Sequence, residues 1–160
     1  MEITFRNITE DDYSYIINNL NDWWGGREMT NMLPRLFFNY FNDTGFVAVS
    51  DEKILGFFIG FFSQTDHRDA YVHFVGVDPE YRKHNIGRRL YDFFSERVLG
   101  AGVEKIYCVT SPINKISIAF HEKIGFQVMP GNKKNADGIE FFSDYDGSGE
   151  DRVLFVKNLV

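Results

Sequence analysis

The stretch Val77-Asp78-Pro79-Glu80-Tyr81-Arg82-Lys83-His84-Asn85-Ile86-Gly87-Arg88-Arg89-Leu90 joins a strand end, a basic loop and a helix start. The first turn of such a helix offers unpaired backbone N–H groups and the positive end of the helix dipole. Gly87 lets a ligand approach the backbone closely. On physical grounds alone, the stretch is a candidate site for a phosphate or pyrophosphate. A solvated basic helix face that binds nothing is the competing interpretation.

Apolar periodicity on either side predicts the remaining elements. Strands are expected at residues 3–8, 46–50, 54–62, 71–77, 105–110, 126–129 and 152–159. Helices are expected at residues 9–20, 32–41, 85–99 and 114–124, and the polar segment 131–151 has no clear period. Strand–helix–strand units in the second half imply a partly parallel sheet. The chain is therefore predicted to be one mixed α/β (α+β) domain over residues 1–160.

A second motif is Asn114-Lys115-Ile116-Ser117-Ile118-Ala119-Phe120-His121-Glu122-Lys123-Ile124-Gly125-Phe126. Together the two motifs resemble those of the GNAT superfamily of N-acetyltransferases. Arg82, Asn85 and Gly87 occupy the three fixed positions of the signature loop, and His121 stands where the family often has tyrosine. Asn85 departs from the usual glycine. Asparagine is the next most tolerant residue for left-handed backbone angles, so the loop is still expected to form.

The resemblance implies a mixed central sheet of about seven strands, flanked by about four helices and splayed between the fourth and fifth strands. It also implies acetyl-CoA as the acyl donor. The backbone of Val75 and Val77 would hold the pantetheine arm, while their side chains belong to the core. Backbone amides of His84, Asn85, Ile86, Gly87 and Arg88 would bind the pyrophosphate, helped by Arg82 and Lys83. Asn114 either caps its helix or contacts the cofactor arm.

Acetyl transfer requires a neutral amine, and a lysine-like amine with a pKa near ~10.4 is neutral in roughly one molecule in 2,500 at pH 7. A base and an acid for the departing thiolate are therefore expected. His73 is the candidate base, with a satisfied core histidine as the alternative. His121 is the candidate acid by its motif position, with a surface histidine as the alternative. No glutamate lies on the strand of His73, so the residue that usually acts as the base in this family, through a water, has no counterpart on that strand.

The acceptor pocket is expected to come from the first half of the chain and from the late loop. Trp23 and Trp24, beside two glycines, suit either a pocket wall or a packed helix end. Residues 144–151 look superficially like a calcium loop, but they lack the full EF-hand spacing and are interpreted as an exposed acidic turn. Cys108 is interpreted as a small core residue.

The composition narrows the class of function. A formal net charge of -6 without a long basic run argues against nucleic-acid binding and weakly favours a cationic acceptor. The chain start lacks a signal-peptide pattern, and no apolar run approaches the ~20 residues of a membrane span. We therefore expect a cytoplasmic protein with no membrane partner and no metal site. A homodimer is a possible assembly, since dimers are common in the superfamily.

These observations favour an acetyl-CoA-dependent N-acetyltransferase that transfers the acetyl group directly to a primary amine of a small molecule or peptide. The alternative is a catalytically silent acyl-CoA-binding regulatory module. The absence of the family's usual tyrosine and glutamate keeps that alternative open.

Overall fold

The computed structural model describes all 160 residues. Its main sheet has seven strands in the order β1-β2-β3-β4-β5-β9-β6. These strands are β1 (Thr4–Asn7), β2 (Phe46–Ser50), β3 (Lys53–Phe62), β4 (Asp69–Val77), β5 (Lys105–Thr110), β9 (Val153–Asn158) and β6 (Gln127–Val128). The α-helices are α1 (Tyr13–Trp23), α2 (Leu36–Tyr40), α3 (Ile86–Leu99) and α4 (Lys115–Lys123). The predicted mixed sheet of seven strands with four helices is confirmed.

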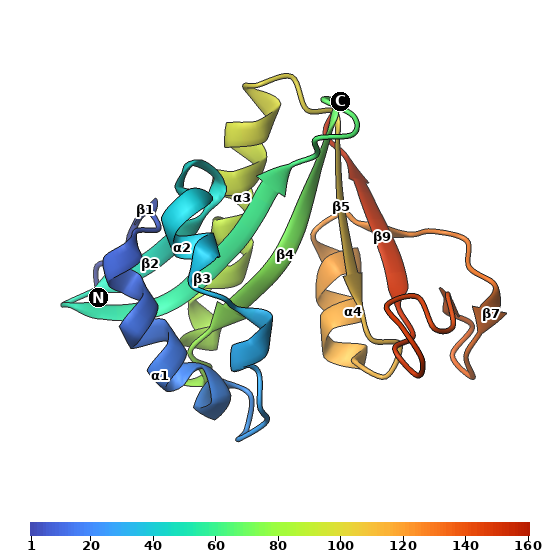
Figure 1. Cartoon of the computed structure of the whole chain (residues 1–160), viewed down its shortest axis with the longest axis horizontal. Coiled ribbons are helices and arrows are strands. Elements are labelled where there is room, and N and C mark those ends of the chain that lie inside the picture. Colours follow the sequence, from blue (N-terminus) through green and yellow to red (C-terminus); the bar gives the residue numbers. More distant parts are fainter.

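The helices cover the two faces of the sheet unequally (Figure 1). One core cluster of 19 buried residues joins the sheet to α3 and α4, and a second of 11 joins β2–β4 to α1 and α2. In the picture, α1 and α2 lie over the half formed by β1–β4, and no helix lies over β5 and β9 on that side. The sheet thus keeps one half of one face without a helical cover.

The sheet opens between β4 and β5, as the resemblance predicted. These two strands form its one parallel pair, and their pairing covers only Asp69–Tyr71 against Lys105–Tyr107. Beyond Tyr71, β4 continues to Val77 while staying paired with β3 on its other side. Figure 1 shows the two strands diverging from that short contact. The backbone of β4 from Val72 to Val77 therefore has no strand partner on the β5 side.

Two predicted segments differ from the structure. The helix expected over 32–41 is replaced by a 3₁₀ turn at Thr30–Met32 and by α2, because proline disfavours helical angles in the residue before it. Leu33, which precedes Pro34, has φ -132° and ψ 64°. The segment 131–151 is not wholly irregular: β7 (Lys133–Lys134) and β8 (Glu140–Phe141) pair as a short hairpin.

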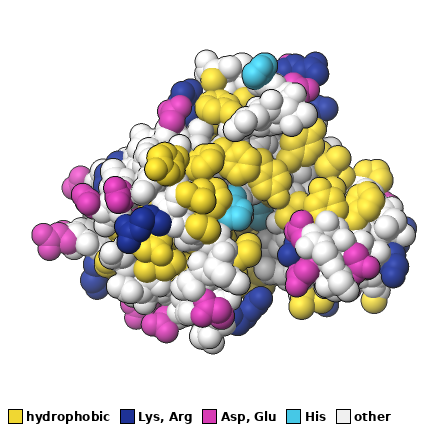
Figure 2. Space-filling view, in the orientation of Figure 1, with side chains coloured by type: hydrophobic (Ala, Val, Ile, Leu, Met, Phe, Trp, Pro, Cys, Tyr) yellow, Lys and Arg dark blue, Asp and Glu magenta, His cyan; other side chains and the backbone are white.

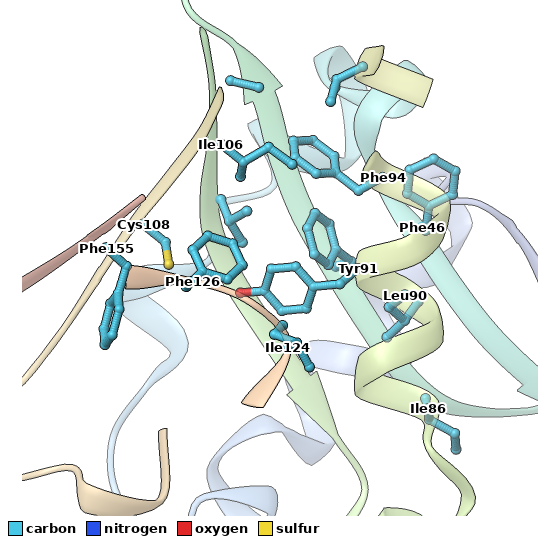
Figure 3. Packing of buried hydrophobic residues seen from close by; sticks show 14 of the residues in the cluster. Phe46, Ile86, Leu90, Tyr91, Phe94, Ile106, Cys108, Ile124, Phe126 and Phe155 are labelled. Atoms are coloured by element: carbon cyan, nitrogen blue, oxygen red, sulfur yellow. The ribbon is translucent and has the colours of Figure 1, made fainter. Parts of the chain in front are cut away.

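The buried face of α3 includes a tyrosine. Tyr91 is 4% exposed and points into the core toward Cys108, Phe126 and Phe155 (Figure 3), whereas Phe93 is 38% exposed. Phe93 instead stacks on Phe5, with ring centroids 5.0 Å apart. A tyrosine hydroxyl consequently lies deep between α3 and β5. No helix is both long enough and apolar enough to cross a membrane.

Candidate active site

The basic loop is a short 3₁₀ helix over Pro79–His84 followed directly by α3. It begins where the carboxylate of Asp78 accepts a hydrogen bond from the Glu80 N–H at 3.0 Å. Between the two helices, Asn85 takes left-handed angles of φ 56° and ψ 26°. The expectation that asparagine can replace glycine at this turn is therefore confirmed.

The two sequence motifs meet at a hollow of about 220 Å³ at the start of α3. Its lining combines both motifs: Arg82, Asn85, Gly87, Arg88, Phe120, Lys123 and Ile124. The first intrahelical bond runs from Arg89 N–H to Asn85 O, so the amides of residues 86–88 have no acceptor within the helix. None of the three cationic side chains in the lining has an ion-pair partner. The hollow thus combines free amides and free positive charge, which suits a pyrophosphate.

The other residues predicted to bind the cofactor lie outside the lining of the hollow. Lys83 and His84 are exposed and do not line the hollow. Val75 and Val77 are half-buried on the diverging part of β4, with side chains packed against the larger core cluster. Asn114 caps α4, since its side chain accepts from Ser117 N–H at 3.1 Å. Capping therefore accounts for the conformation of Asn114.

His73 lies at an irregular point of β4. The register of β3 and β4 pairs Ile59 with Phe74 and Gly60 with Val72, so His73 is the extra residue of a β-bulge. Its ring stacks on Phe37 with centroids 4.6 Å apart, and its Nε2 is 2.7 Å from the carbonyl oxygen of Met32. Because a carbonyl only accepts, Nε2 carries the proton, and Nδ1 keeps a lone pair that can accept another. This tautomer is the one that a general base needs.

His121 occupies a different environment, on the opposite face of the sheet. Its Nδ1 donates to the carbonyl of Ser117 at 2.7 Å, so Nε2 is the acceptor for the Tyr91 hydroxyl, also at 2.7 Å. The ring stacks on Phe155 with centroids 5.2 Å apart. Burial lowers the pKa of His121 below its ordinary value, partly offset by the bond to Ser117. The resting side chain is therefore neutral, with both ring nitrogens engaged.

The lowered pKa of His121 predicts a loss of stability in mild acid. The unfolded chain takes up a proton near the ordinary pKa of 6.5, while the folded chain resists it because the imidazolium would be buried. The free energy of unfolding should therefore fall as pH drops from 7.5 through 6.5 towards the lower folded pKa. Urea unfolding of the wild type and of His121→Gln at pH 7.5 and 5.5 measures this contribution. An equal pH-dependent loss in both proteins would contradict it.

Of the two adjacent tryptophans and the cysteine, Trp23 and Cys108 have structural roles. Trp23 is 6% exposed and stacks on Phe57, so of the two alternatives it takes the packed helix end. Trp24 is half-buried against Phe74, with ring centroids 5.0 Å apart, and remains a candidate pocket wall. Burial raises the pKa of the Cys108 thiol to about 12, which keeps it protonated. Cys108 is therefore a core residue, as predicted.

The carboxylates of the turn at residues 144–151 form ion pairs and hydrogen bonds with other groups of the chain. Arg152 pairs with Asp146 at 2.8 Å and with Glu150 at 3.2 Å. The carboxylates of Asp144 and Asp151 accept backbone N–H groups of the same turn. The structure contains no group of three or more histidine, cysteine or acidic residues arranged to hold a metal ion.

The family follows from the sequence match. The model of the acetyltransferase (GNAT) family matches residues 8–126, which is most of the chain. The chain belongs to the GNAT acetyltransferase family. This match spans both motifs that form the hollow at α3. No curated protein sequence matches the chain.

Solved structures share this GNAT fold at low sequence identity. Ard1 from Thermoplasma volcanium has a TM-score of 0.79 at 15% identity, with 100% of this chain and 99% of that chain covered. Diaminobutyrate acetyltransferase EctA from Paenibacillus lautus, solved with L-2,4-diaminobutyric acid and coenzyme A, has 0.70 at 24%, covering 98% and 95%. Naa20 from Chaetomium thermophilum, solved with a bisubstrate analogue, has 0.75 at 18%, covering 97% and 86%. These likenesses show the fold.

Sequence reasoning missed the partners of both histidines. Met32 and Phe37 reach His73 from the α2 region, and Tyr91 reaches His121 from α3. Helical spacing could have indicated the burial of Tyr91, because it lies one turn before the buried Phe94 and two turns before Val98. Phe120 and Ile124, two apolar residues of the second motif that were not predicted as site residues, also line the hollow.

Proposed function

We propose that this chain is an acetyl-CoA-dependent N-acetyltransferase that moves the acetyl group directly to a primary amine of a small molecule or peptide. The main support is the cationic hollow at α3 next to the unpartnered edge of β4. Coenzyme A needs these two features side by side, because the hollow would take its pyrophosphate and the free strand edge would bind the amides of its extended arm. A cytoplasmic location and a homodimer remain predictions that accompany this proposal.

The residues present fit coenzyme A in the following way. Arg82, Arg88 and the amides of residues 86–88 would hold the pyrophosphate in the hollow, with Lys123 on its far wall. The free backbone of Val75 and Val77 on β4 would bind the amides of the pantetheine arm. Lys83 and His84 are exposed beside the loop, where they would add positive charge. Bound acetyl-CoA supplies a thioester, whose carbonyl carbon is the electrophile.

Proton transfer is assigned to the two histidines. A protonated acceptor amine would lose a proton to Nδ1 of His73, the nitrogen left free by the bond of Nε2 to Met32. The neutral amine then forms a C–N bond to the carbonyl carbon as the C–S bond breaks, and its nitrogen gives up a second N–H proton to become the amide. The departing thiolate takes up one proton. His121 is the proposed acid as a relay: once its contact with Tyr91 opens, the neutral ring would accept a proton at Nε2 and pass it to the thiolate.

The decisive experiment combines binding and turnover. Isothermal titration with acetyl-CoA tests the donor, and release of free thiol over a panel of monoamines, polyamines, aminoglycosides and peptide N-termini tests the transfer. We expect binding at sub-millimolar concentration and turnover of at least one amine class. Failure to bind acetyl-CoA would overturn the proposal. Binding without turnover on the whole panel would support the alternative of a silent acyl-CoA-binding module.

A further inference from the structure

The half of the sheet without a helical cover carries apolar side chains. In β5 and β9, Ile106, Cys108, Val153 and Phe155 are buried in the larger core cluster with α3 and α4. Because side chains alternate along a strand, the residues between them point to the opposite face. These residues are Tyr107, Val109, Leu154 and Val156, all half-buried and part of neither core cluster. The central part of the uncovered face is therefore apolar, while the pair Lys105 and Asn158 makes one end of it polar.

A chain of aromatic rings connects this face with His73. Tyr71, the parallel partner of Tyr107, stacks on Phe61 with centroids 5.6 Å apart. Phe61 then meets Phe41 at 5.8 Å, and Phe41 meets Phe37 at 5.2 Å. Phe37 in turn stacks on His73. Figure 2 shows hydrophobic side chains (yellow) as a band across this side of the molecule, with histidine (cyan) in the hollow beside it.

The carboxylates near this band are engaged within the chain. The acidic turn 144–151 lies close to Tyr71, whose pKa is raised to about 12 by burial and then by nearby groups that include Asp146. Asp146 and Glu150, however, are both paired with Arg152, while Asp144 and Asp151 accept backbone N–H groups of the turn. The band itself offers aromatic and aliphatic side chains to a ligand.

We infer that the acceptor is a primary amine on an uncharged, aromatic or aliphatic body, which lies against Tyr107, Val109 and Tyr71 with its amine at His73. This inference rests on the proposed function and specifies its substrate class. The acceptor must reach the gap between β4 and β5 from the side of His73, and the surface that flanks this approach is the apolar band. The local surface thus outweighs the net charge of -6, which had weakly favoured a cationic acceptor.

The test compares kcat/KM for 2-phenylethylamine and hexylamine with that for spermidine and kanamycin, at saturating acetyl-CoA. We expect the two apolar amines to be preferred by at least about tenfold, since even one methylene in an apolar pocket can contribute about that factor. Hexylamine should also exceed butylamine. Equal or better turnover of spermidine or kanamycin would overturn the inference while leaving the proposed acetyltransferase intact.

Substitutions in the apolar band test whether the preference for apolar amines arises there. Tyr107→Ser and Val109→Ser should each raise KM for 2-phenylethylamine about tenfold and leave the Kd of acetyl-CoA within about twofold. Leu99→Ser is the matched control, because Leu99 is 44% exposed at the end of α3, outside the band, and this variant should keep the wild-type KM. Unchanged KM in both band variants would overturn the proposed location. If acetyl-CoA itself fails to bind the wild type, the proposed function fails instead.

Discussion

Replacing Gly87 with glutamate should weaken acetyl-CoA binding by at least about 100-fold, which corresponds to about 2.7 kcal/mol. A side chain at this position projects between α3 and α4, since a Cβ built there lies 3.4 Å from Phe120 Cζ and 3.8 Å from Val77 Cγ2. The longer glutamate would place a carboxylate in the hollow, where it would pair with Arg82 or Arg88 and repel a pyrophosphate. Opposed like charges at an interface cost several kcal/mol. Isothermal titration with acetyl-CoA and with coenzyme A measures the change.

Gly87→Ala is the control for this prediction. The contacts of the added Cβ with Phe120 and Val77 are at ordinary van der Waals distances, so the alanine variant should bind within about threefold of the wild type. Thermal unfolding of both variants checks that the start of α3 still folds. Wild-type affinity in Gly87→Glu would mean that the pyrophosphate does not use this hollow.

The fold could be predicted because local and global signals agree. Alternating apolar residues mark β4 and β5, and Gly87 and the basic residues mark the start of α3. The left-handed turn at Asn85 was also predictable, because few residues other than glycine adopt those angles at low cost. Such features depend on residues near one another in the chain.

Features that depend on distant segments could not be predicted. The bond from His73 to Met32 joins residues 41 apart, and that from Tyr91 to His121 joins residues 30 apart. Nothing in the sequence around His73 indicates the β-bulge that aims its ring at Phe37. Gly76 is a similar case: a Cβ there would lie 2.9 Å from Phe57 Cζ and Trp24 Cη2, a restriction visible only after three segments pack. The sequence therefore predicted the turn at the start of α3 better than the surroundings of the two histidines.

His73→Gln should lower kcat for the amine acceptor by about 100-fold at pH 7, the lower range of a general base. The glutamine side chain can keep a hydrogen bond to the carbonyl of Met32, but its amide has no nitrogen that accepts a proton. The loss should shrink as pH rises, because the acceptor amine deprotonates in solution near its own pKa, ~10.4 for a lysine-like amine. The pH profile of kcat separates this role from a structural one.

His67→Gln is the control for this last prediction, because His67 is exposed in the turn between β3 and β4 and should leave both kcat and its pH profile unchanged. His73→Ala should show the same loss as His73→Gln, together with lower stability from the lost bond to Met32. A purely structural role predicts a different result, in which His73→Gln keeps its activity and His73→Ala loses it. Full activity with an unaltered pH profile in His73→Gln would exclude His73 as the base and leave the proton to a water or to another group at the β4–β5 gap.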